Sequence, residues 1–143
     1  MASEHGGFAT LLVIQLLAAV VLFGVIIFWP GQWNAMRWTG AVIAAPALVM
    51  LFVARYQLGK SFSVTAQARK LVTNGVYSKI RNPIYVFSGL MVLGFALTLQ
   101  GPVLVAILLV LIPLQVIRAR KEAKVLEDAF GDQYREYRKR TWF

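Results

Sequence analysis

The sequence contains no cysteine, a single histidine and only six acidic residues among its 143. Without cysteine the chain forms no disulfide, holds no thiolate-ligated metal and has no cysteine nucleophile. The histidine, His5, lies in a terminal stretch. Glu4 is the one other metal-ligating side chain near it in the sequence. We therefore expect no metal site.

Acidic residues are also absent from a long stretch, since no Asp or Glu occurs between His5 and Lys121. A membrane transporter of small cations normally carries a carboxylate inside its spans, where the carboxylate couples ion movement to transport. This absence argues against a transporter.

Apolar residues, in contrast, make up 59% of the chain, and the mean hydropathy is +0.66. A helix needs about 20 apolar residues to cross a bilayer. Four runs approach this length, at about 8–29, 38–58, 84–99 and 101–117. The last two meet at Gln100-Gly101-Pro102, which is typical of a tight turn opening a new helix. The sequence predicts an all-α, polytopic membrane protein with about four transmembrane helices in a single domain, 1–143.

Basic residues predict the orientation in the membrane, because Lys and Arg accumulate on the cytoplasmic side of short loops. With four spans, Arg37 is the one basic residue that falls on the opposite side. Both termini are then cytoplasmic, in an integral, multi-pass membrane protein. The formal net charge of +9 is explained by this topology and by attraction to anionic headgroups, so no nucleic-acid partner is expected. The other basic residues are Arg55, Lys60, Arg69, Lys70, Lys79 and Arg81 before the third span, and Arg118, Arg120, Lys121, Lys124, Arg135, Arg138, Lys139 and Arg140 after the fourth.

Two polar segments flank the last two spans. Residues 59–80 are expected to form an interfacial loop or a short amphipathic helix. Apolar residues recur at helical spacing over 118–137, which predicts a C-terminal helix along the cytoplasmic face, with a helix end at Phe130-Gly131.

These segments carry an ordered set of motifs. Gly75-x-Tyr77 and Arg81-Asn82-Pro83-x-Tyr85 precede the hydrophobic hairpin. Arg118-x-x-x-Glu122, Leu126 and Phe130-Gly131-x-x-Tyr134 follow it. Taken together, over about 71–137, they resemble the isoprenylcysteine carboxyl methyltransferase family and its relatives, which include phospholipid N-methyltransferases.

The resemblance implies an enzyme that uses S-adenosyl-L-methionine, bound between the interfacial loop, the last spans and the C-terminal helix. It implies catalytic roles for Arg81, Asn82 and Glu122. Two positions depart from the family pattern: Asn82 replaces the usual histidine, and Ala123 replaces the second residue of a Glu-Glu pair. Asparagine does not titrate near neutral pH. The cofactor-binding residues implied are Gly75, Tyr77, Arg81, Asn82, Tyr85, Arg118, Glu122 and Leu126.

The residue types suit this cofactor. An arginine binds a carboxylate bidentately, a carboxylate accepts from an amine or from ribose hydroxyls, and a tyrosine face attracts a cation such as a sulfonium. A lipophilic acceptor is expected to enter from the bilayer. The candidates are a prenylated thiol-linked carboxylate, another isoprenoid acid and a lipid amine, and an already nucleophilic carboxylate suits the chain best.

Simpler interpretations stay open. Arg81 fits a headgroup anchor, Glu122 fits an exposed partner of Arg118, and the tyrosines fit an interfacial belt. At the level of the whole protein, the alternatives are a non-catalytic membrane scaffold and an NADPH-dependent membrane reductase. The oligomeric state is not determined, although Gly24 and the Gly89–Gly94 face are candidates for close helix pairing.

Overall fold

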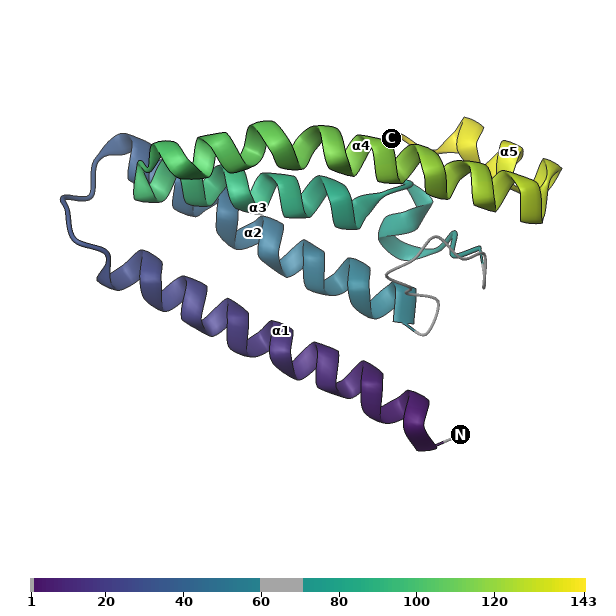
Figure 1. The fold of residues 1–143 in the computed structure, drawn as a ribbon, viewed down its shortest axis with the longest axis horizontal. Helices are drawn as coiled ribbons and strands as arrows, with labels where there is room; N and C mark the ends of the chain where they lie inside the picture. The colour runs from purple at the N-terminus through teal and green to yellow at the C-terminus, as the bar shows by residue number, and fades with distance from the viewer. Residues whose placement is uncertain (1, 60–70) are drawn as a thin grey trace.

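Helices make up the described fold. The computed structural model describes residues 2–59 and 71–143 (Figure 1). Within these segments there is no β-strand, only an isolated bridge, so the predicted all-α class is confirmed. The elements are α1 (Ala2–Phe28), α2 (Ala35–Leu58), the 3-10 helix η2 (Gly75–Ser78), α3 (Pro83–Leu99), α4 (Pro102–Phe130) and α5 (Asp132–Arg140).

Local sequence explains where α3 and α4 begin and end. Each has a proline in its first turn, where the missing N–H has no intrahelical acceptor to lose. Gln100 ends α3 in the left-handed conformation, at φ 52°. Gly131 ends α4 at φ 51°, a value that glycine adopts without steric cost. The predicted hairpin and the predicted helix end at Phe130-Gly131 are both present.

The predicted separate helix over 118–137 is wrong in its bounds. Residues 118–130 continue α4 without interruption, and α5 starts only after Gly131. The change from apolar to charged residues near Ile117 is a change of surroundings and does not break the hydrogen bonds of a helix. Of the predicted interfacial segment, residues 60–70 lie outside the described residues, while part of the remainder forms η2.

Close contact between α2 and α3 forms the centre of the bundle. A Cβ added to Gly40 would lie 2.5 Å from the carbonyl oxygen of Gly94, and one added to Gly94 would lie 2.6 Å from the backbone nitrogen of Ala44. Buried Thr98 donates its hydroxyl to the Gly94 carbonyl at 2.8 Å. Small residues thus let the two backbones touch. The Gly94 part of the predicted pairing face is therefore used within the chain.

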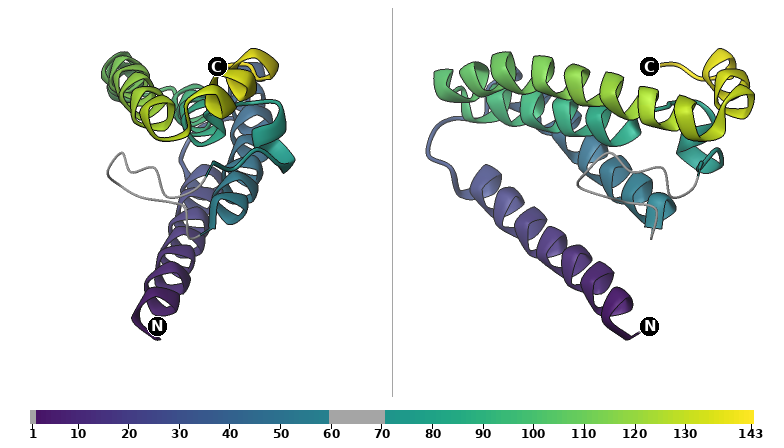
Figure 2. Two further views of the ribbon diagram at one scale, coloured as in Figure 1. Left: turned by 90° about the vertical axis from the view of Figure 1, so that its right-hand side faces the viewer. Right: turned by 45° about the vertical axis from the view of Figure 1, so that its right-hand side comes forward.

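The first helix packs differently from the others. Figures 1 and 2 show α1 diverging from the bundle toward the N-terminus. Near its other end, Ile26 is buried with Ala44 of α2 and Phe95 of α3. The loop after α1 and the α3–α4 turn lie at one end of the molecule, whereas the N-terminus, η2 and α5 lie toward the other (Figure 1).

Arg37 fastens α1 to α2. Its side chain is 2% exposed and lies 4.5 Å from the centre of the Trp33 ring. The C-terminal carbonyls of a helix carry partial negative charge, so a cation is stabilised there. The guanidinium donates to the carbonyl oxygens of Ile26 (2.8 Å), Trp29 (2.8 Å) and Gly31 (2.9 Å).

Among the residues that the structure describes, two helices, α2 and α4, are long and apolar enough to cross a membrane. The part of α1 that enters this comparison, Val13–Phe28, and α3, Pro83–Leu99, are shorter apolar segments. Four spans therefore stay a prediction, as does the cytoplasmic position of α5.

Candidate functional site

Three polar side chains meet where α3 begins beside α4. Tyr85, in the first turn of α3, donates its hydroxyl to Oε1 of Glu122 on α4 at 2.5 Å. Arg118, one turn earlier on α4, places Nη2 4.0 Å from the same oxygen and its guanidinium carbon 5.9 Å from the centre of the Tyr85 ring. The hairpin thus joins the two sequence motifs through one carboxylate.

The Glu122 carboxylate is only partly enclosed. Its side chain is 27% exposed and that of Arg118 is 50% exposed. An ion pair this accessible contributes about 1 kcal/mol or less to stability. Stability is therefore a poor explanation for the Arg118–Glu122 ion pair, and the partly exposed Glu122 carboxylate is well suited to accept further hydrogen bonds.

The 3-10 helix η2 carries Tyr77 into the interior. Tyr77 is 6% exposed, and its hydroxyl is buried with no hydrogen-bond partner among the described residues. Burial, with the nearby Tyr137 and then Glu122, raises the pKa of Tyr77 above the usual range of a phenol. The phenol is consequently neutral over the working pH range and keeps a proton to donate.

The side chain of Gln57, at the end of α2, holds η2 in place by a hydrogen bond to its backbone. Its Oε1 accepts from the backbone N–H of Val76 at 2.8 Å. Gly75 has φ +58° and would, with a Cβ, overlap the Gln57 amide, so this position needs glycine for both conformation and space. The sequence motifs did not identify Gln57; its one signal is an amide at the polar end of an apolar run.

Arg81 lies between η2 and α3. Its Nε is buried and, within the part of the chain that the structure describes, has no hydrogen-bond partner. The charge of Arg81 acts on Tyr134 and Tyr137, where it opposes the rise in pKa that burial causes. Arg81 thus faces the two tyrosines of α5. No ion pair between Arg81 and Glu122 occurs in the described segments.

Tyr134 and Tyr137 belong to the fold, not to an exposed aromatic belt. They are 1% and 5% exposed, and their ring centres are 6.2 Å apart. Tyr137 donates its hydroxyl to the carbonyl oxygen of Tyr77 at 2.7 Å. Burial and the neighbouring Tyr134 raise the pKa of Tyr137 to about 12. The belt interpretation is therefore wrong for both residues.

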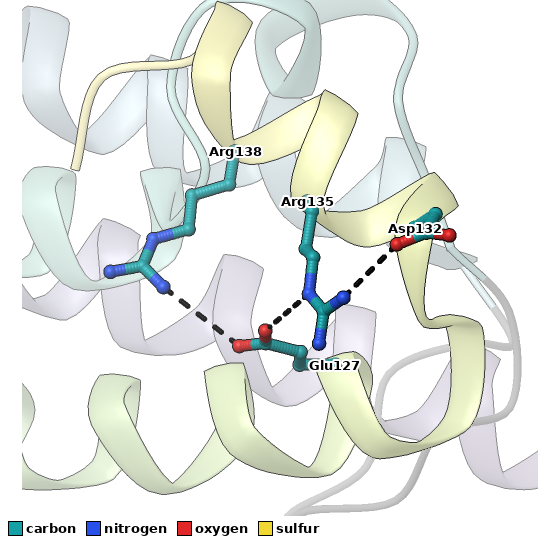
Figure 3. Close-up of polar contacts among 4 residues, drawn as sticks. All are labelled: Glu127, Asp132, Arg135 and Arg138. Carbon is teal, nitrogen blue, oxygen red and sulfur yellow. Dashed lines mark hydrogen bonds and ion pairs between the residues drawn. The ribbon is translucent and has the colours of Figure 1, made fainter.

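An ion-pair cluster at the corner between α4 and α5 sets the direction of α5 (Figure 3). Glu127 accepts from Nε of Arg135 at 2.8 Å and lies 3.8 Å from Nη1 of Arg138. Arg135 also donates to Asp132 at 3.0 Å. These contacts hold α5 against α4, with its tyrosines directed to η2.

The predicted site residues therefore separate into groups. Tyr85, Arg118 and Glu122 form one contacting cluster, and Tyr77 lies close enough to Glu122 and Tyr85 for their charges to affect its pKa. Asn82 caps α3 without a side-chain hydrogen bond to the helix. Leu126 is half-buried one turn beyond Glu122 and supplies no polar group.

Comparison with known proteins agrees with this arrangement. The family model for phospholipid methyltransferases matches residues 34–133, which include α2, η2, α3 and α4. A search of curated proteins finds no match. The chain therefore belongs to the phospholipid methyltransferase family, one of the membrane methyltransferases of the isoprenylcysteine carboxyl methyltransferase type.

Proposed function

We propose that the protein is a membrane methyltransferase that uses S-adenosyl-L-methionine and modifies a lipophilic acceptor. The observation that supports this best is the Tyr85–Glu122–Arg118 cluster. Two buried groups from the segment that leads into α3, Tyr77 Oη and Arg81 Nε, lack partners among the described residues. A buried donor without a partner is costly. A polar ligand that accepts from both would remove that cost.

The donor set fits the cofactor. Arg81 provides a charged donor for the cofactor carboxylate, and Glu122 provides an acceptor for its amine or ribose hydroxyls. Tyr77 and Tyr85 provide aromatic surface beside a sulfonium. When bound, S-adenosylmethionine would supply an electrophilic methyl group. Leu126 and Gly75 would line the same site, Gly75 by letting the backbone approach closely.

The protein residues would contribute mainly by alignment and by excluding water. Asn82 carries no titrating group, the phenols are neutral, and the Glu122 carboxylate is already assigned to the cofactor, so none of these residues is left to remove a proton from the acceptor. A carboxylate on an isoprenoid or similar lipid needs no base. This favours a carboxylate over a lipid amine as the acceptor, entering from the bilayer beside α3 and α4.

A non-catalytic relative is the second candidate, and Asn82 and Ala123 favour it. Asn82→His tests it directly, because the side chain makes no capping bond and its replacement should leave folding intact. Methyl transfer that appears only in Asn82→His would show that the family histidine had been lost together with activity.

The experiment that tests the proposal is calorimetric titration of the purified protein with S-adenosylhomocysteine. We expect wild-type protein to bind it, and Arg81→Ala and Glu122→Ala each to weaken binding by at least about tenfold, through loss of a charge-assisted hydrogen bond. Glu136→Ala is the matched control, since Glu136 is exposed on α5 and, among the described residues, its carboxylate pairs with Arg140 alone, at 3.9 Å.

Three other outcomes would count against the proposed methyltransferase function. Equal affinity in all variants would place the site elsewhere. Heat with NADPH but not with S-adenosylhomocysteine would favour a membrane reductase. No heat with either would favour the non-catalytic relative.

A further inference from the structure

A short segment after α5, residues 141–143, runs beside the chain that leads into α3. The two segments form an isolated parallel bridge between Ile80 and Trp142. Three hydrogen bonds join them: Trp142 N to Lys79 O (2.8 Å), Arg81 N to Trp142 O (2.9 Å) and Asn82 N to Phe143 O (2.9 Å).

These hydrogen bonds act on the two residues that precede Pro83. The first N–H groups of a helix, and those just before it, have no acceptor within the helix. Asn82 does not cap α3 with its side chain, and Pro83 has no N–H. The carbonyls of Trp142 and Phe143 accept from the N–H groups of Arg81 and Asn82, which lie just before the helix, and so fix the backbone from which the Arg81 side chain extends.

The same stretch is held at two further points. Gln57 of α2 accepts from Val76 N at 2.8 Å, and Tyr137 of α5 donates to the carbonyl of Tyr77 at 2.7 Å. Thr141 in turn donates its hydroxyl to the Tyr137 carbonyl at 2.9 Å, which ties residues 141–143 to the end of α5. Residues 75–82 are thus held by α2, by α5 and by the segment that follows α5.

The side chain of Trp142 does not take part. It is 65% exposed, and the Trp142 backbone both donates to and accepts from the segment ahead of α3. The contribution of this residue to the site is therefore a property of its main chain, which most substitutions preserve and only loss of the residues removes.

We propose that residues 141–143 are a backbone brace that holds Arg81 and Asn82 in place for ligand binding. Residues 141–143 are thus positioning residues of the cofactor site. The inference rests on the proposed function. It predicts that cofactor affinity depends on the presence of residues 142 and 143 and not on the identity of their side chains.

Two variants of the full-length chain test the brace: a deletion of residues 142–143, and Trp142→Ala with Phe143→Ala. We expect the deletion to weaken S-adenosylhomocysteine binding by about tenfold or more, because two acceptors and one donor are lost. The double alanine variant should bind within about threefold of wild type, since its backbone hydrogen bonds are kept. The far-ultraviolet circular dichroism of both should match wild type.

Hydrogen exchange provides a second measurement that does not need the deletion to fold. The amides of Arg81 and Asn82 should exchange slowly in wild-type and double alanine protein. Fast exchange there, unchanged affinity after the deletion, or equal loss in both variants would each overturn the brace. Wild-type protein that binds no S-adenosylhomocysteine would overturn the proposed function and, with it, a brace for ligand binding, whereas binding that survives the deletion would overturn the brace alone.

Discussion

Buried phenols distinguish this site at the level of single residues. Tyr77, Tyr134 and Tyr137 are 6%, 1% and 5% exposed, and burial is the main cause that raises the pKa of each. Neutral tyrosines keep their protons as hydrogen-bond donors, and the Tyr137 hydroxyl uses its proton to join α5 to η2. Burial of these hydroxyls is tolerated only in the protonated, neutral form, because a buried phenolate would lose its hydration.

Stability should consequently fall at high pH. The pKa of Tyr137 is about 12 in the folded protein and 10.0 for an unperturbed phenol. The unfolded chain therefore loses this proton first as the pH rises, so stability is complete below about pH 10 and declines toward pH 12. Thermal unfolding in detergent between pH 9 and 12 measures the decline.

Tyr137→Phe is the variant that assigns this effect. At neutral pH it should lower the free energy of unfolding by about 1 kcal/mol, through loss of one buried hydrogen bond. Between pH 10 and 12 its stability should fall less steeply than that of wild type. Equal slopes in the two proteins would mean that folding does not raise the pKa of Tyr137.

At the level of helices, the contact between α2 and α3 depends on glycine. A Cβ on Gly40 would lie 2.5 Å from the Gly94 carbonyl and from the Thr98 backbone nitrogen, and backbone atoms cannot move aside as a flexible side chain can. Gly40→Ala should therefore destabilise the protein by about 1–3 kcal/mol. The change in the thermal unfolding midpoint is the measurement.

Gly24→Ala is the matched control, because a Cβ at Gly24 meets no atom within 4 Å. Alanine is the better helix former, so this variant should be neutral or more stable by up to about 1 kcal/mol. A loss in Gly24→Ala as large as that in Gly40→Ala would argue against the α2–α3 contact as the cause.

The ion pairs at the corner between α4 and α5 should affect the position of α5 more than the free energy of unfolding. The side chains of Glu127, Arg135 and Arg138 are 32%, 61% and 59% exposed. We expect Glu127→Gln to cost about 1 kcal/mol or less, and less still at high salt. We expect faster hydrogen exchange in α5 to be easier to detect than this change in stability, because the Glu127 carboxylate joins α4 to α5 through Arg135 and Arg138.

Glu136→Gln serves as the control for that experiment. Glu136 also lies on α5, and within residues 2–59 and 71–143 its carboxylate forms an ion pair with Arg140 alone, at 3.9 Å on the same helix. Its replacement removes the same charge without touching the corner. Similar exchange in the two variants would contradict the role given to Glu127.

At the level of the whole molecule, charge and arrangement agree on one orientation. The N-terminus, η2 and α5 lie toward one end (Figure 1). Lys60, Arg69 and Lys70 lie outside the described residues, and every Lys and Arg of the described part except Arg37 belongs to a segment at or leading to that end. The exception, Arg37, is buried against helix carbonyls. We propose that the α5 end is cytoplasmic, with four spans.

The absence of native cysteine makes this topology easy to measure. Single cysteines at Gln32 and Glu136 should react with an impermeant maleimide from opposite sides of the membrane, and one at Ser3 should behave like Glu136. Both Gln32 and Glu136 are exposed. A Ser3 cysteine labelled from the Gln32 side would reduce the number of spans to an odd one.

Some features of the site follow from residues that lie close together in the chain, and others do not. Pro102 and Gly131 mark a helix start and a helix end by their own conformational preferences, so both were predicted correctly. Residues 118–130 were assigned to a separate helix because polarity changes near Ile117, and polarity reports surroundings and not helix continuity. Gln57 has no local pattern, since its partner Val76 is distant in the sequence.

Composition and spacing were enough for the helical class and for the turns around α3 and α4, whereas the family was indicated by the resemblance of the motifs over about 71–137. The class and the turns depend on the preferences of neighbouring residues and on hydrophobic burial, which are written along the chain. The Tyr85–Glu122 bond, the burial of Tyr134 and Tyr137, and the pairing of residues 141–143 with the start of α3 depend on contacts between distant segments. A backbone hydrogen bond leaves no mark on side-chain identity, so only the folded structure reveals it.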